Sequence, residues 1–169
     1  MADPGALLAT THHVGDGLRV RLRLCRPSDH RRVGAFLDGL SPETRRRVGE
    51  VRDFTFFNPR ERLVVAAARP VDGADAIVGL ADCTLVSTGL AKLVVVVDDD
   101  AQGRGVGRLL TGAIADLARR QGATHLKAEL SEDNLAMVRL MERLGQTVRT
   151  DEDGVVALYT VLAATARAA

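Results

Sequence analysis

The segment LVVVVDDDAQGRGVGRLL, residues 93–110, contains five consecutive apolar residues, three carboxylates and three alternating glycines that lead into a helical pattern. A continuous run of mostly β-branched residues is typical of a strand that is buried on both faces. Glycines let the backbone of QGRGVG adopt positive φ and let a ligand approach its amides closely. A helix N-terminus follows at once, and its unpaired N–H groups favour an anion such as phosphate. The segment therefore predicts an anion-binding turn between a buried strand and a helix.

Two side chains of this turn, Arg104 and Arg108, can pair with phosphate oxygens. The turn is not a P-loop, because neither Gly103 nor Gly105 begins the spacing GxxxxGK followed by Ser or Thr. It is not a dinucleotide-binding fingerprint either, because Arg108 and Leu110 stand where GxGxxG needs its third glycine. On the residues alone, a glycine-rich turn before a core helix stays as the alternative to a phosphate-binding turn.

The composition of the whole chain narrows the class of protein. A chain of 169 residues fits one domain, which buries about 70% of the surface of the unfolded chain. The longest apolar run, residues 63–68, is too short for a membrane-spanning helix, and residues 1–16 lack the basic and apolar regions of a signal peptide. The net charge of +1 argues against a broad nucleic-acid-binding face. Cys25 and Cys83 show no metal-binding spacing and are expected to be buried thiols. We therefore expect a cytoplasmic protein that binds neither nucleic acid nor membranes.

Hydrophobic periodicity predicts one domain at residues 17–163, between a flexible tail at residues 1–16 and a short tail at 164–169. Strands are expected at residues 18–26, 63–68, 76–86, 90–97, 124–130 and 155–162. Helices are expected at residues 28–39, from Ser41 onward, from residue 106 to a cap at Gly122, and at residues 134–144.

Three stretches of the sequence resemble one family. QGRGVG, residues 102–107, resembles the Q/R-x-x-G-x-G/A motif with which the Gcn5-related N-acetyltransferases (GNAT) bind the pyrophosphate of acetyl-CoA. HLKAELSEDNLAMVRLMERLG, residues 125–145, resembles the next strand and helix of that family, with Asn134 where the family contacts the pantetheine arm. LRLCRPSDHRRVGAFLDGLSPETRRR, residues 22–47, is similar to the first strand and helices of the branch that includes bacterial protein-lysine acetyltransferases.

The resemblance implies an α/β (α+β) domain with about four helices and a mixed, mostly antiparallel sheet of six to seven strands. The sheet would be splayed between its fourth and fifth strands, with acetyl-CoA in the splay and the backbone near Val95 and Val97 paired with the pantetheine amides. The residues expected to bind acetyl-CoA are Val95, Val97, Gln102, Gly103, Arg104, Gly105, Val106, Gly107, Arg108, Asn134 and Met141. No metal ion is expected.

The sequence departs from the family at the positions that handle protons. Met141 stands where many members have a tyrosine that protonates the leaving thiolate. Lys92 stands where the protein-lysine branch has a glutamate base, and lysine is a base only if burial lowers its pKa far. Glu129 is the candidate replacement, because it shares one strand face with Lys127. The alternative is that Glu129 forms structural ion pairs with Lys92 or Lys127.

Three functions follow from the resemblance. The first is an N-acetyltransferase that moves an acetyl group from acetyl-CoA to a primary amine, either a protein lysine or a small-molecule amine. The alternative is a catalytically weak or inactive CoA-binding regulatory module, and the third is an enzyme that uses a longer acyl-CoA. The acceptor site would lie near residues 45–47 and the four phenylalanines, although aromatic residues of this kind also pack in cores. A homodimer is left open.

Overall fold

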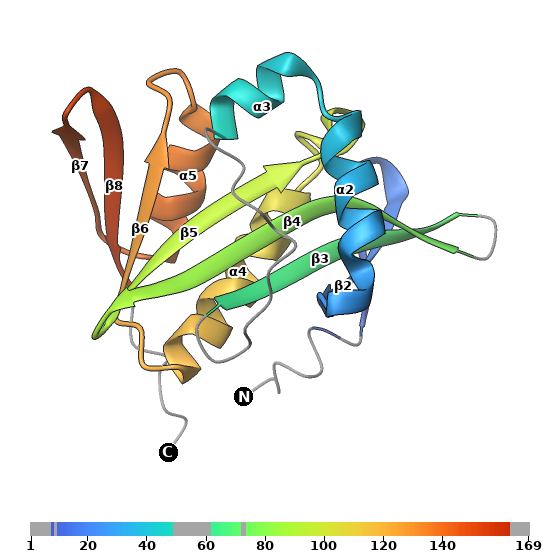
Figure 1. Cartoon of the computed structure of the whole chain (residues 1–169), viewed down its shortest axis with the longest axis horizontal. Coiled ribbons are helices and arrows are strands. Elements are labelled where there is room, and N and C mark those ends of the chain that lie inside the picture. The colour runs from blue at the N-terminus through green and yellow to red at the C-terminus, as the bar shows by residue number, and fades with distance from the viewer. Residues whose placement is uncertain (1–7, 9, 49–61, 72–73, 163–169) are drawn as a thin grey trace.

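The computed structural model of the chain describes residues 8, 10–48, 62–71 and 74–162. Within these residues one sheet of eight strands is packed against four α-helices (Figure 1). The strands are β1 (Thr11–Val14), β2 (Leu18–Leu24), β3 (Arg62–Val71), β4 (Ala74–Ser87), β5 (Leu90–Val97), β6 (His125–Leu130), β7 (Thr147–Glu152) and β8 (Val155–Val161). The helices are α2 (His30–Gly39), α3 (Pro42–Val48), α4 (Val106–Arg120) and α5 (Leu135–Leu144).

The sheet has the order β1-β2-β3-β4-β5-β6-β8-β7. All neighbouring strands are antiparallel except β5 and β6, which run parallel and pair only from Leu90–Lys92 to His125–Lys127. Beyond these three residue pairs β5 and β6 diverge, so their facing backbone edges are not bonded to each other. This is the splay expected between the predicted strands at 90–97 and 124–130, and it is confirmed.

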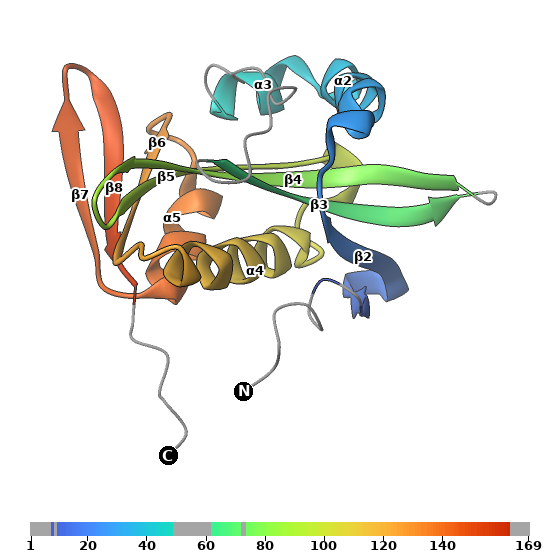
Figure 2. The ribbon, with the colours of Figure 1, turned by 60° about the horizontal axis from the view of Figure 1, so that its bottom comes forward.

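The helices cover both faces of the sheet. Figure 2 shows α2 and α3 on one face and α4 and α5 on the other. The larger apolar cluster lies on the α4 side, where Leu110 and Ile114 are fully buried against the sheet. A smaller cluster joins Val33 and Phe36 of α2 to Val96 of β5. The predicted helical stripe of α4 therefore forms the main core, which fixes the start of α4 at the end of β5.

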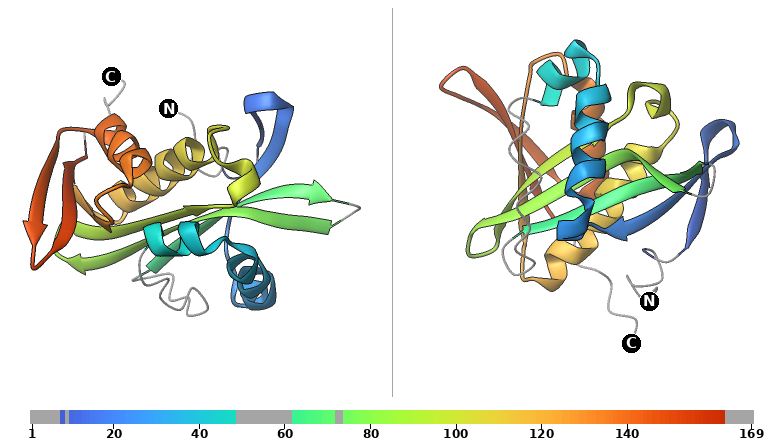
Figure 3. Two further views of the ribbon diagram at one scale, coloured as in Figure 1. Left: turned by 90° about the horizontal axis from the view of Figure 1, so that it is seen from above. Right: turned by 45° about the vertical axis from the view of Figure 1, so that its right-hand side comes forward.

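Two edge strands raise the strand number above the six to seven that were expected. β1 pairs with β2 through Thr11–Val14, so the tail expected at residues 1–16 includes a strand. The hairpin of β1 and β2 lies beside the turn that precedes α4 (Figure 3), and the N–H of Gly15 donates to the carbonyl oxygen of Arg104 at 2.8 Å. The second additional strand, β7, has the polar sequence TVRTDE and pairs only with β8. Both strands are defined by their backbone pairing with one neighbouring strand. Backbone pairing does not require alternating apolar side chains, so the sequence gives no strand signal at these two segments.

Of the two cysteines that were expected to be buried thiols, one is buried and the other is only half-buried. Neither forms a disulfide, and Cys83 is buried while Cys25 is half-buried. Burial raises the pKa of both thiols to about 12. Both thiols are therefore protonated at neutral pH.

Candidate functional site

The glycine turn has the backbone conformation that its sequence predicts. Gly103 has φ of 71° and Gly105, the residue before α4, has φ of 92°, a left-handed conformation that other residues rarely adopt. At Gly107 the space is tight instead, because a Cβ at this position would lie 3.3 Å from Leu140 Cδ1, which would have to shift by a few tenths of an ångström. The first N–H groups of α4 have no acceptor inside the helix and are available to an anion.

A cavity of about 390 Å³ opens beside this turn. It lies between β5, the turn, the first residues of α4, the outer face of α5, and α3. Of the residues predicted to bind acetyl-CoA, the structure brings together at this cavity Val95, Val97, Gln102, Gly103, Gly105, Gly107, Arg108 and Asn134.

The backbone of β5 presents polar groups to the splay at alternate residues. The N–H of Asp98 donates to the carbonyl oxygen of Val78 in β4 at 2.9 Å. The backbone N–H and C=O groups of Asp98, and of every second residue before it, therefore face β4. The carbonyl oxygen of Val97 instead accepts from Gln102 Nε2 at 3.1 Å, which places the backbone of Val97 and of Val95 on the splay side. The Val95 backbone thus faces the splay as expected, while the Val97 carbonyl oxygen is already bonded to Gln102.

Three residues that were predicted to bind acetyl-CoA have side chains that do not line the cavity. The side chains of Val106 and Met141 are fully buried in the core on the α4 side of the sheet. Arg104 lines two other surface hollows, and its Nε lies 4.0 Å from a carboxylate oxygen of Asp16. For Val106 and Met141 the reason is helical direction, because both belong to helix faces that pack on the sheet.

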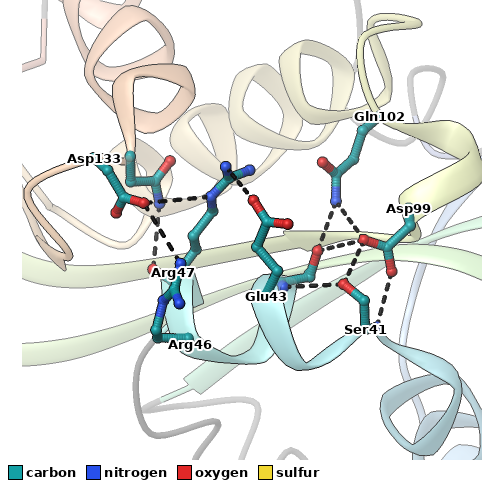
Figure 4. A network of polar contacts seen from close by, with 9 residues as sticks. Ser41, Glu43, Arg46, Arg47, Asp99, Gln102 and Asp133 are labelled. Carbon is teal, nitrogen blue, oxygen red and sulfur yellow. Dashed lines mark hydrogen bonds and ion pairs between the residues drawn. The ribbon is translucent and has the colours of Figure 1, made fainter.

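The N-terminal end of α3 is tied to the turn by a network of polar contacts (Figure 4). The carboxylate of Asp99 accepts hydrogen bonds from the N–H and hydroxyl of Ser41 at 2.9 and 2.8 Å, and from the hydroxyl of Thr44 at 2.6 Å. These bonds, that of Thr44 first, lower the pKa of Asp99. Gln102 Nε2 donates to the Thr44 hydroxyl at 3.0 Å. Asp99, the second of the three adjacent acids after β5, therefore holds α3 against the cavity.

The C-terminal end of α3 is tied to the start of α5. Arg46 and Arg47 each lie within 4 Å of the Asp133 carboxylate, at 3.8 and 3.9 Å. Asn134 Nδ2 donates to the carbonyl oxygen of Arg47 at 3.3 Å, while its Oδ1 accepts from the N–H of Met137 at 3.1 Å. Asn134 is thus both the N-cap of α5 and a link to α3, so α3 spans the cavity from the turn to α5 (Figure 4).

Glu129 lies on β6 outside the cavity lining. Its carboxylate is ion-paired with Lys92 of β5, and Lys127 Nζ lies 3.4 Å from its other oxygen. The hydrogen bond from Lys92 lowers the pKa of Glu129 most, and Lys127 lowers it further. A carboxylate with both oxygens engaged and a low pKa is a weak base, so the arrangement favours the alternative of structural ion pairs.

The structure adds residues that the sequence did not point out. Thr44 of α3 and Arg139, Leu140 and Arg143 of α5 line the cavity. The spacing of Arg139 and Arg143, four residues apart, was the available signal, because such residues share one face of a helix. Among the described residues that line the cavity there is no carboxylate, histidine or tyrosine.

The region expected to bind the acceptor is described only in part. Phe36 is buried in the core beneath α2, as the packing alternative predicts, while Phe54, Phe56 and Phe57 lie outside the described residues. Within the described ranges no three His, Cys, Asp or Glu side chains are grouped as a metal site requires. No helix in the described part of the chain is long and apolar enough to cross a membrane.

Comparison with curated proteins gives several relatives, among them two acetyltransferases. The acetyltransferase Pat of Mycolicibacterium smegmatis is 37% identical to this chain over 81 residues, which cover 46% of this chain and 24% of that protein. An acetyltransferase of Pseudomonas aeruginosa is 29% identical over 149 residues, covering 82% of this chain and 80% of that protein. The matched segment thus spans about a quarter of the length of the first relative and most of the second.

Solved structures share the fold. The GNAT domain of PAT from S. lividans matches 93% of this chain and 98% of its own, with a TM-score of 0.78 and 25% identity. A cAMP-binding acyltransferase from Mycobacterium smegmatis matches 95% of this chain but 49% of its own, with a TM-score of 0.67 and 24% identity, which shows the fold alone. The model of the Acetyltransferase (GNAT) family matches residues 29–146, more than half of the chain. The chain therefore belongs to the GNAT acetyltransferase family.

Proposed function

We propose that the protein is an N-acetyltransferase that transfers the acetyl group of acetyl-CoA to a primary amine, either a protein lysine or a small-molecule amine. The observation that carries this proposal is the cavity beside the left-handed glycine turn, in a sheet that opens between β5 and β6. The cavity fits the donor in charge as well as in position, because arginines and no acids stand among the described residues that line it.

Each part of the cavity suits one part of acetyl-CoA. The amides of the turn and of the first residues of α4, with Arg108, would hold the diphosphate. The Val95 backbone on the splay side would pair with a pantetheine amide. Acetyl-CoA supplies an activated acyl carbon that an amine can attack. Because the Val97 carbonyl is bonded to Gln102, we assign Gln102 the role of shaping the turn.

Proton transfer in this proposal depends on water. No described residue that lines the cavity has an ordinary acid or base group, and Glu129 is held by two lysines. We propose that the acceptor amine loses its proton to solvent before it attacks. With a lysine acceptor we expect the rate to rise steadily with pH toward the amine pKa of about 10.4, without a plateau near neutrality.

A CoA-binding module without turnover is the second candidate. It is favoured by the residues at the two positions where the family has its proton-transfer groups. Met141 is buried in the core, and Lys92 is ion-paired with Glu129. Calorimetric titration with acetyl-CoA and CoA, followed by thiol release in the presence of lysine peptides and small amines, separates the candidates. Binding with amine-dependent thiol release supports the enzyme. Binding without release from any amine supports the module, and absence of binding refutes both.

A further inference from the structure

The charge of the cavity lining is uneven. Four arginines line it, and of these Arg47 has carboxylate partners, Glu43 at 2.6 Å and Asp133 at 3.9 Å. Arg108, Arg139 and Arg143 form no ion pair with any carboxylate among the described residues. The cavity therefore carries positive charge that no carboxylate among the described residues compensates.

Arginines elsewhere in the fold show the contrast. Arg23 is bonded to Asp29 at 2.7 and 2.9 Å, and Arg119 lies 2.6 Å from Asp116. A guanidinium group remains charged at any physiological pH, so three such groups at one cavity repel each other. An anionic ligand would relieve this repulsion, and arginine matches the geometry of phosphate oxygens with paired N–H donors.

The positions of these arginines divide the positive charge of the cavity into two regions. Arg108 belongs to the first turn of α4, next to the glycine turn. Arg139 and Arg143 lie one turn apart on α5, on a face that also carries Leu140. Leu140 packs against Gly107, which sets this face of α5 beside the start of α4. The α5 pair is therefore adjacent to the turn but separate from it.

We propose that Arg139 and Arg143 bind the 3′-phosphate of CoA and make the protein select CoA over dephospho-CoA. The inference rests on the proposed function, in which the amides of the turn take up the diphosphate. CoA carries one further anionic group, the 3′-phosphomonoester, and the α5 pair supplies the guanidinium groups that remain. Selectivity for CoA over other acyl carriers then resides in α5, whereas the turn supplies the general affinity for a diphosphate.

The test compares acetyl-CoA with dephospho-acetyl-CoA by calorimetric titration. The two probes differ only in the 3′-phosphate. The double variant Arg139→Gln with Arg143→Gln keeps good helix formers at two exposed positions, and its melting temperature verifies the fold. Arg149→Gln is the matched control, because Arg149 is an exposed arginine of β7 that does not line the cavity.

The unaltered protein should bind acetyl-CoA about 100-fold more tightly than dephospho-acetyl-CoA. Each of the two arginines would make one charge-assisted contact with the 3′-phosphate, and each contact raises the affinity about tenfold. The double variant should lose this preference through weaker binding of acetyl-CoA alone, while Arg149→Gln keeps it. A double variant that retains the preference, or that weakens both probes equally, overturns the assignment to these arginines. If the unaltered protein binds neither probe, the proposed function itself fails, which is a different result from equal binding of both.

Discussion

Replacing Gly105 with valine tests the turn directly. Gly105 has φ of 92°, and a Cβ added there would meet only Val14, at 3.9 Å, so space is not the obstacle. The left-handed conformation costs an L-residue about 1–2 kcal/mol, with a β-branched residue at the upper end. For a chain of this length each kcal/mol lowers the melting temperature by about 2–4 °C. We therefore expect Gly105→Val to melt about 2–8 °C below the unaltered protein.

The same change should weaken CoA binding. If the backbone relaxes to negative φ, the amides next to residue 105 rotate away from a diphosphate. Loss of one hydrogen bond to a charged acceptor is worth about 1.5–3 kcal/mol, or roughly a 10- to 100-fold rise in Kd. Titration of the folded variant with CoA measures this. Gly112→Ala is the control, because Gly112 lies within α4 and an added Cβ meets nothing within 4 Å. A folded Gly105→Val protein with unchanged affinity would refute the assignment of the turn.

Three further predictions follow from the local contacts. Asn134→Ala should lose about 1 kcal/mol of stability by removing the N-cap of α5, whereas Asn134→Asp should restore the melting temperature, because aspartate also caps helices; equal melting of both variants contradicts the cap. Glu129→Gln should destabilise the protein at pH 7, because the Glu129 pKa is lowered by Lys92, and the difference from the unaltered protein should shrink as the pH falls and acid protonates the carboxylate; denaturant midpoints at pH 7 and at pH 3 measure it, and a difference of equal size at both pH values excludes this cause. Cys25 and Cys83, with pKa values of about 12, should react slowly with Ellman's reagent in the native protein at pH 8 and rapidly after unfolding, so fast native labelling would show that burial does not protect them.

The sequence predicted the fold wherever side chains alternate between core and solvent. The apolar spacing of α4 is a direct consequence of burial, and α4 and β5 both lie where expected. The expectation that β5 is buried on both faces is not met, because Val96 is buried but Val94, Val95 and Val97 are half-buried beside the splay and the cavity. β1 and β7 could not be predicted in this way. Strands at the edges of a sheet bury few side chains, so THHV and TVRTDE carry the hydrogen bonds of a strand without its pattern.

The site was predictable where it depends on backbone conformation. Glycine spacing identified the turn because only the backbone matters there. Side-chain direction was harder, because it depends on how each helix is rotated on the sheet. Val106 and Met141 belong to the buried stripes of their helices, and the apolar periodicity of each helix already indicated that these side chains face the core. The contacts of Asp99 with residues of α3 join segments 55 to 58 positions apart, which no local pattern reveals.

The strand β1 has a practical consequence for anyone who shortens this chain. A boundary at residue 17, which the sequence pattern suggests, would remove the partner of β2 from Leu18 to Arg21. An uncovered strand edge presents unpaired N–H and C=O groups that recruit other chains, so the shortened protein would be prone to aggregate. The cut would also remove the hydrogen bond from Gly15 to the carbonyl oxygen of Arg104 and leave the outer side of the turn unsupported. Loss of CoA affinity in such a protein would then reflect a missing brace, even though every residue that lines the cavity is still present.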